Sequence, residues 1–253
     1  ADVRDGRRDG VGGLVEAVES ARGSYVAVQG PPGTGKTYVG SRAVKELLDR
    51  GWTVGVTAQS HAVVENFLDQ LIGVGVDPDR VGKEPKDPDG PHRWTSLCSS
   101  EVHAFLAPGR VLGGTAWTFA NAAAQPVDLL VVDEAGQLSL AHLLGASALA
   151  ETVLLLGDPQ QLPQVSRGEH PQPIGDAALT WIAEGAPVLR ADRGFFLDTS
   201  WRMHSALTRA VSELSYAGRL GAREEVTDAR RLDGVAVSYT HPDAADEEDS
   251  VDL

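Results

Sequence analysis

The sequence predicts an α/β fold in which a mostly parallel β-sheet is flanked by helices. Short apolar segments typical of buried strands alternate with longer segments that have helical spacing of apolar residues. The predicted strands end in glycine or polar residues, and in a parallel sheet such ends share one ligand-facing edge. The length of 253 residues and the 42% hydrophobic content suit one domain of average size and part of a second.

Two successive strand–helix units are predicted in the first part of the chain. Residues 24–29 form an apolar segment that predicts a buried strand, and residues 37–49 follow with helical spacing. Residues 52–58 predict a second strand, and residues 62–72 a second amphipathic helix. Two βα units in succession indicate a parallel sheet with helices on its faces.

Three further strands are predicted at residues 111–115, 128–133 and 153–158. Residues 73–93 are rich in proline, glycine and charge, which predicts a loop or small insertion and not a core element. A helix is expected at about residues 205–216. The five strands together bring their polar ends to one rim of the sheet.

The composition narrows the class of protein. Cys98 is the single cysteine, which excludes an internal disulfide and is typical of a reducing compartment. Because the sequence shows neither an apolar stretch of membrane-spanning length nor the pattern of a signal peptide, we expect a soluble, cytoplasmic monomer without a membrane partner. The net charge of −14 is unusual for a nucleic-acid binder, although net charge does not report local patches.

The glycine-rich segment after the first predicted strand matches the P-loop pattern Gly-x4-Gly-Lys-Thr. In such a loop, backbone N–H groups wrap a phosphate, Lys36 reaches the β- and γ-phosphate oxygens, and Thr37 binds magnesium. A plain glycine turn is the alternative, and the strand before and helix after favour the P-loop. The residues expected to bind ATP are Gly30, Pro31, Pro32, Gly33, Thr34, Gly35, Lys36 and Thr37.

Two adjacent acids, Asp133 and Glu134, follow the apolar segment 129–132. We expect Asp133 to hold Mg²⁺, directly or through water, and Glu134 to polarise the attacking water. Two acids at a strand end are also common as surface or capping residues. The P-loop upstream favours the catalytic interpretation.

The strand at 153–158 ends in the polar turn Gly157-Asp-Pro-Gln-Gln-Leu-Pro163. A glutamine at this place can hydrogen-bond both the γ-phosphate and a nearby polynucleotide, and would then report hydrolysis to the rest of the protein. A Gly-Asp-Pro turn with solvent-facing glutamines is the ordinary alternative.

These segments together resemble the motifs of superfamily 1 helicases, in the branch of the nonsense-mediated-decay helicase and the nuclease-helicase of Okazaki-fragment processing. The resemblance extends over about residues 24–220 and favours bacterial members fused to a RecB-like nuclease. Motifs I to IV correspond to residues 30–37, Asp133-Glu134-Ala-Gly-Gln137, the turn 157–163 and Ser200-Trp-Arg-Met-His204, and motifs Ia and Ic to residues 57–64 and 113–116.

The resemblance implies a RecA-like fold and roles that the residues alone do not show. Gln161 would contact the γ-phosphate, Arg202 would stabilise it from a second RecA-like domain, and Trp201 would stack on the base where the family usually has tyrosine. A ring beside a cation suits a nucleotide clamp, and a core aromatic is the alternative for Trp201. The expected catalytic residues are Lys36, Asp133, Glu134, Gln161 and Arg202.

Motifs Ia and Ic line the single-strand path in such helicases, which implies phosphate or sugar contacts by Ser60, His61 and Thr115. Plain helix caps are the alternative for these three residues. The implied partner is single-stranded nucleic acid, with DNA favoured over RNA, and a nuclease domain in the same full-length chain fits the resemblance.

The resemblance divides the chain into a motor domain at residues 1–190, with an insertion at about 73–110, and the start of a second domain at 191–253. Residues 11–22 hold no adenine-reading glutamine, and no segment after Tyr216 resembles motif V or the arginine-bearing motif VI. We therefore expect these residues alone to bind ATP and Mg²⁺, hydrolyse ATP slowly, and leave duplexes unwound.

Two other functions fit part of the pattern. An AAA+ remodeller would share the P-loop and acids, would assemble as a hexamer, and leaves the motif at residues 200–204 unexplained. A nucleotide-dependent interaction module without useful catalysis would need no complete catalytic set, and the set of Lys36, Asp133, Glu134 and Gln161 argues against it.

Overall fold

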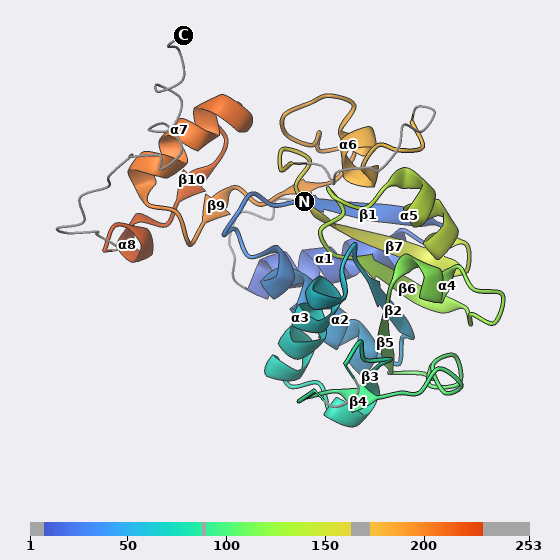
Figure 1. Cartoon of the computed structure of the whole chain (residues 1–253). Helices are drawn as coiled ribbons and strands as arrows, with labels where there is room; N and C mark the ends of the chain where they lie inside the picture. The colour runs from blue at the N-terminus through green and yellow to red at the C-terminus, as the bar shows by residue number, and fades with distance from the viewer. Residues whose placement is uncertain (1–7, 88–89, 163–172, 230–253) are drawn as a thin grey trace, which may run out of the picture.

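The computed structural model describes residues 8–87, 90–162 and 173–229 (Figure 1). The strands of the main sheet are β1 (Ser24–Gln29), β2 (Val54–Thr57), β3 (Val81–Lys83), β4 (Thr95–Ser96), β5 (Val111–Gly114), β6 (Val127–Val132), β7 (Ala150–Gly157) and β8 (Phe195–Phe196). The helices around it are α1 (Arg8–Ser20), α2 (Lys36–Asp49), α3 (His61–Gly73), the short 3-10 helix η1 (Pro78–Arg80), α4 (Ala116–Phe119), α5 (Leu140–Ser147) and α6 (Ala178–Ala183).

The eight strands form one sheet in the order β4-β3-β5-β2-β6-β7-β1-β8. Every pairing between neighbouring strands in the described part of the chain is parallel. This confirms the predicted α/β fold with a mostly parallel sheet. Because all strands point the same way, the segments after β1, β2, β5, β6 and β7 leave the sheet at one rim.

Helices cover both faces of the sheet, which explains why the central strands are apolar without alternation. On one face α1, α2 and α3 pack against side chains such as Val56, Val131 and Leu154. On the other face the smaller α4, α5 and α6 pack against Leu130 and Leu155, which come from the same strands. Among the described residues, no helix has both the length and the apolar character that crossing a membrane requires.

The segment predicted to be a loop or insertion contributes two short strands to the sheet. β3 pairs with β5, and β4 pairs with β3, so both extend the parallel sheet at its edge. Lys83, at the end of β3, has only 1% of its side chain exposed and forms an ion pair with Glu65 of α3 (2.9 Å between Nζ and Oε1). The charge of Lys83 is thus compensated in the interior by Glu65, and the composition of the segment did not predict this buried position.

A small separate unit follows the main sheet. It consists of β9 (Thr199–Ser200), α7 (Ser205–Ser215), β10 (Gly221–Ala222) and α8 (Glu224–Thr227), which lie beside the main body in orange and red (Figure 1). β9 and β10 pair in parallel, and Val188, Tyr216 and Leu220 form a core of their own. β8 still pairs with β1, so the main sheet continues to residue 196. The predicted division at residues 190 and 191 remains a prediction, and the acidic C-terminal residues lie outside the described part.

Candidate nucleotide-binding site

The predicted P-loop connects β1 to α2 at the rim of the sheet. Gly33 and Gly35 have φ angles of +78° and +86°, the left-handed region that glycine adopts without strain. A Cβ at Gly30 would collide with the side chain of Lys36, so the loop folds tightly around the lysine stem. α2 begins at Lys36 directly after Gly35. The backbone therefore has the compact turn and helix N-terminus that an anion site needs.

The two functional side chains of the loop lie in the first turn of α2. Lys36 is buried, and its ammonium group donates to the carbonyl of Gly30 (2.7 Å between Nζ and O). Thr37 is half-buried at the next position. Thr34 closes the loop by donating its hydroxyl to the carbonyl of Pro31 (2.7 Å). The carbonyl of Pro32 accepts a hydrogen bond from the hydroxyl of Ser200 (3.3 Å).

The acids predicted to bind the metal and activate water follow β6 at the same rim. Asp133 is 2% exposed, and it accepts a hydrogen bond from the backbone N–H of Glu134 (3.0 Å). Burial raises the pKa of Asp133 to about 7, the charge of Glu134 adds to the rise, and the Glu134 N–H and the charge of Lys36 oppose it. Lys36 follows β1 and Asp133 follows β6, so the P-loop lysine and the acid lie at the same rim of the sheet.

Glu134 adopts a backbone conformation that is rare for its residue type. Its φ angle is +52°, in the left-handed region, where a side chain with a Cβ is strained. Neighbouring hydrogen bonds hold it there: its carbonyl accepts from the N–H of Gln137 (2.8 Å), and Ala135 donates to Leu156 of β7 (2.8 Å). The strain is thus maintained at the residue predicted to act on water.

The polar turn after β7 lies between the P-loop and the acids. β7 is flanked by β1 and β6, so its end reaches both. The N–H of Gly30 donates to the carbonyl of Gly157 (2.9 Å), and a Cβ at Gly136 would collide with the backbone of Asp158. Gln161, which is half-buried, follows in this turn and donates its N–H to the carbonyl of Asp158 (3.3 Å). The turn that carries the predicted sensor is therefore adjacent to both parts of the site.

The segment with Trp201 and Arg202 docks directly on the P-loop. Trp201 donates its N–H to the carbonyl of Gly33 (2.8 Å), and the Ser200 hydroxyl donates to the carbonyl of Pro32 (3.3 Å). A Cβ at Gly33 would collide with the Cβ of Arg202. Residues separated by more than 160 positions in the chain are thus in contact, and Trp201 is 39% exposed beside the loop.

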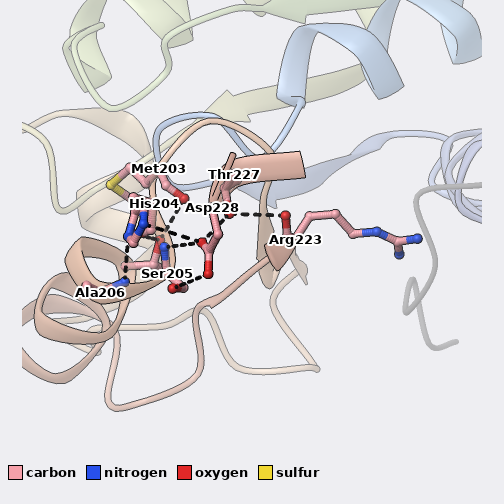
Figure 2. A network of polar contacts seen from close by, with 8 residues as sticks. Met203, His204, Ser205, Ala206, Arg223, Thr227 and Asp228 are labelled. Atoms are coloured by element: carbon pink, nitrogen blue, oxygen red, sulfur yellow. Dashed lines mark hydrogen bonds and ion pairs between the residues drawn. The ribbon is translucent and has the colours of Figure 1, made fainter. Parts of the chain in front are cut away.

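A network of polar contacts fixes this segment to α7 (Figure 2). His204 caps the helix by accepting a hydrogen bond from the N–H of Ala206 through Nδ1 (3.2 Å). Asp228, after α8, accepts from the N–H and the hydroxyl of Ser205 (3.0 and 2.8 Å). These bonds hold the pKa of Asp228 below its usual range, and the bond from the Ser205 N–H has the larger effect. The Arg223 guanidinium lies 5.3 Å from the centre of the Trp201 ring.

The three predicted nucleic-acid contacts lie at the starts of α3 and α4, after the neighbouring strands β2 and β5. Ser60 caps α3 by accepting from the N–H of Val63 (3.3 Å), which is the alternative role expected for it. His61 follows, and its Nδ1 is buried without a hydrogen-bond partner. Thr115 precedes α4 and makes no capping bond through its side chain. Their role as nucleic-acid contacts remains a prediction.

Three buried residues join the parts of the site through hydrogen bonds and were absent from the predicted site residues: Gln29, Asp158 and Tyr216. Gln29, the last residue of β1, donates to Asp158 (3.5 Å) and to the carbonyl of Pro187 (3.0 Å), and accepts from the N–H of Leu189 (2.7 Å). Tyr216 donates to the same carboxylate. A glutamine ending an apolar strand was the available signal for Gln29, whereas nothing in the sequence pairs Tyr216 with Asp158.

The residues at this rim fit a magnesium-bound nucleoside triphosphate. The glycine loop and the start of α2 suit phosphates, and Thr37 and Asp133 offer the oxygen ligands that Mg²⁺ prefers. Gly33 and Gly35 supply the positive φ angles of the tight turn that precedes the helix N-terminus. The fold and the site together define a P-loop ATPase.

The sequence matches the family AAA_30, described as an AAA domain, over residues 13–234. The chain belongs to this family. Among curated proteins, it is 27% identical over 215 residues to the DNA replication ATP-dependent helicase/nuclease JHS1 of Arabidopsis thaliana, covering 81% of this chain and 16% of that protein. It is 26% identical over 209 residues to the human DNA replication ATP-dependent helicase/nuclease DNA2, covering 78% of this chain and 19% of that protein.

Solved structures show the same fold. The arterivirus nonstructural protein 10 helicase matches with a TM-score of 0.52 and 18% identity, over 82% of this chain and 43% of that one. These comparisons confirm the predicted resemblance to superfamily 1 helicases, the RecA-like fold and the use of a nucleotide. The chain spans less than a fifth of the length of the two helicase/nucleases.

Proposed function

We propose that the chain is the ATP-hydrolysing motor segment of a helicase that moves on single-stranded nucleic acid. Lys36 and the glycine loop would hold the phosphates, Thr37 and Asp133 the Mg²⁺, and Glu134 would accept a proton from the attacking water. Bound Mg²⁺ would neutralise charge on the phosphates. Gln161 would contact the γ-phosphate, and Arg202 would stabilise charge there.

One observation carries this proposal. The segment with Trp201 and Arg202 contacts the carbonyls of Pro32 and Gly33, so a tryptophan and an arginine from outside the main sheet lie beside the phosphate loop. A general P-loop ATPase needs no such segment from its own chain. A motor that couples hydrolysis to movement of a second unit does need one, because the nucleotide must contact both units.

The proposed nucleic-acid substrate is supported by the similarity to DNA helicases and by the positions of three residues at the rim of the sheet. Both curated relatives described above are named as DNA replication enzymes, and the arterivirus helicase has a structure described as a complex with DNA. Ser60, His61 and Thr115 lie after adjacent strands, so one strand of nucleic acid would pass over all three. We therefore favour single-stranded DNA over RNA, and propose that a nuclease domain shares the full-length protein.

The first experiment measures ATP hydrolysis under single-turnover conditions with and without single-stranded DNA or RNA of the same sequence. We expect slow hydrolysis that rises with DNA and less with RNA. Equal rates with and without both polymers would contradict a nucleic-acid motor. Rates comparable to intact helicases would contradict the expectation that a further arginine is needed for full activity.

The second experiment tests the residue roles. Glu134→Gln should retain binding of a fluorescent ATP analogue and lower hydrolysis by about 10²–10⁴-fold, because it removes a general base. Lys36→Ala should weaken nucleotide binding itself. Glu16→Gln changes an exposed acid of α1 and should leave both quantities at the wild-type level. A Glu134→Gln variant with wild-type turnover would contradict the role of Glu134 as the general base.

A further inference from the structure

Tyr216, at the end of α7, makes a hydrogen bond that joins the small C-terminal unit to the main domain. Its hydroxyl donates to Oδ2 of Asp158 with 2.6 Å between the oxygens. Tyr216 is 3% exposed and Asp158 is 1% exposed. Burial, followed by the bond to Asp158, raises the pKa of Tyr216, so the phenol keeps its proton and remains the donor. Short hydrogen bonds to a carboxylate are among the stronger ones in proteins.

Asp158 is also the residue on which the Gln161 turn is built. Its Oδ1 accepts the backbone N–H of Gln160 (3.1 Å), and its carbonyl accepts the N–H of Gln161 (3.3 Å). A change in the position of the Asp158 side chain therefore moves the backbone that carries Gln161. The bond from Tyr216 acts on this turn without any contact between Tyr216 and a nucleotide.

The other end of α7 is fastened to the segment that carries Arg202. His204 and Asp228 cap the first turn of the helix (Figure 2), and Trp201 bonds to Gly33 of the P-loop. α7 is an eleven-residue helix, so its two ends move together. One short, rigid element thus connects the segment with Arg202, beside the P-loop, to the turn with the glutamine.

We propose that Tyr216 is a positioning residue for ATP hydrolysis, because its bond to Asp158 fixes the Gln161 turn relative to the Arg202 segment. The inference rests on the proposed function, in which both side chains act on the γ-phosphate. Loss of the bond lets the two elements adopt separate positions. Ground-state binding of ATP by the P-loop does not depend on that alignment, so the defect should fall on kcat and not on KM.

The test replaces Tyr216 by phenylalanine, which removes the hydroxyl and keeps the ring in its core. We expect kcat for ATP hydrolysis to fall by about 10-fold, with KM for ATP within about twofold of wild type. Asp158→Asn weakens the same bond from the other side and should lower kcat to a similar extent. Tyr25→Phe, a tyrosine change at the start of β1, is the matched control and should keep the wild-type kcat.

A double-mutant cycle with Gln161→Ala separates positioning from general stability. If Tyr216 acts through the Gln161 turn, Tyr216→Phe should have little further effect on kcat in the Gln161→Ala background. Fully additive effects on kcat, or a Tyr216→Phe variant that loses thermal stability but retains kcat, would overturn the inference. A wild-type chain without any ATP hydrolysis would overturn the proposed function and this inference with it.

Discussion

Replacing Gly33 by alanine should detach the Trp201–Arg202 segment from the P-loop. The new Cβ would collide with the Cβ of Arg202 and would lie 3.1 Å from the Ser200 hydroxyl. Gly33 also has a φ angle of +78°, which disfavours any side chain. The substitution therefore adds backbone strain and a steric conflict at the one place where the two units meet the phosphate loop.

The protein can either keep the Gly33→Ala overlap or relieve it by detaching the Trp201–Arg202 segment, and the less costly of these responses sets the loss of stability. Left-handed backbone strain costs about 1–2 kcal/mol for a residue with a Cβ. The collision can then be relieved by detaching the segment, which loses the Trp201–Gly33 and Ser200–Pro32 hydrogen bonds. Two such bonds contribute roughly 2 kcal/mol, less than a severe overlap of backbone-near atoms. Gly33→Ala should thus cost about 3–4 kcal/mol in total.

Gly23 provides a matched control. Its φ angle is +71°, and no heavy atom lies within 4 Å of the position that a Cβ would take, so Gly23→Ala carries the strain without the collision. Urea unfolding of both variants, followed by circular dichroism, measures the difference, and single-turnover hydrolysis measures the loss of Arg202 from the site. Equal destabilisation by both substitutions, with hydrolysis retained in Gly33→Ala, would refute the docked arrangement.

Three further predictions concern the sheet edge and α7. Glu65→Ala should lower the free energy of unfolding by about 2–3 kcal/mol, because it leaves the buried Lys83 ammonium with the neutral Glu84 carbonyl and no charged partner, whereas Lys83→Met should cost under about 1 kcal/mol; urea titrations compare them. Burial, followed by the charge of Lys83, lowers the pKa of His61 below 6.5, so His61 itself costs stability as the pH drops below about 6.5; relative to wild type, His61→Gln should therefore be more stable at pH 5 than at pH 7 in thermal melts. Asp228→Asn should speed amide exchange in the first turn of α7 roughly fivefold, because Ser205 loses a charged acceptor; unchanged exchange would contradict the capping role.

The long, apolar elements of the fold were predictable because strands buried on both faces of the sheet have continuous stretches of apolar residues in the sequence. The strand predicted at residues 24–29 agrees with β1 in both bounds, and the helix predicted at 37–49 differs from α2 by one residue. β3 and β4 were not predicted. They contain three and two residues, too few to show a period, and the buried Lys83 has its ion-pair partner, Glu65, on α3. Such a partner is a property of the tertiary structure.

The candidate site was predictable where function constrains a local segment. The P-loop and the two acids each combine a strand end with the residues that phosphate or metal binding needs, and the structure places them at one rim. Contacts between distant segments were not predictable in this way. The collision that makes Gly33 necessary involves Arg202, and the left-handed conformation of Glu134 is held partly by the hydrogen bond from Ala135 to Leu156 of β7. Neither has a signature within a few residues of its own position.

The strand order explains why the turn after β7 has a central place in the site. In the sequence, the acids precede this turn and the P-loop lies far upstream, whereas in the sheet β7 separates β6 from β1. The turn therefore contacts Gly30 on one side and the backbone near Gly136 on the other, while Asp158 also accepts from Tyr216 of α7. A change at the γ-phosphate would reach the acids, the P-loop and α7 through this one segment. The order of the strands, more than any single motif, makes the turn suited to couple hydrolysis to the second unit.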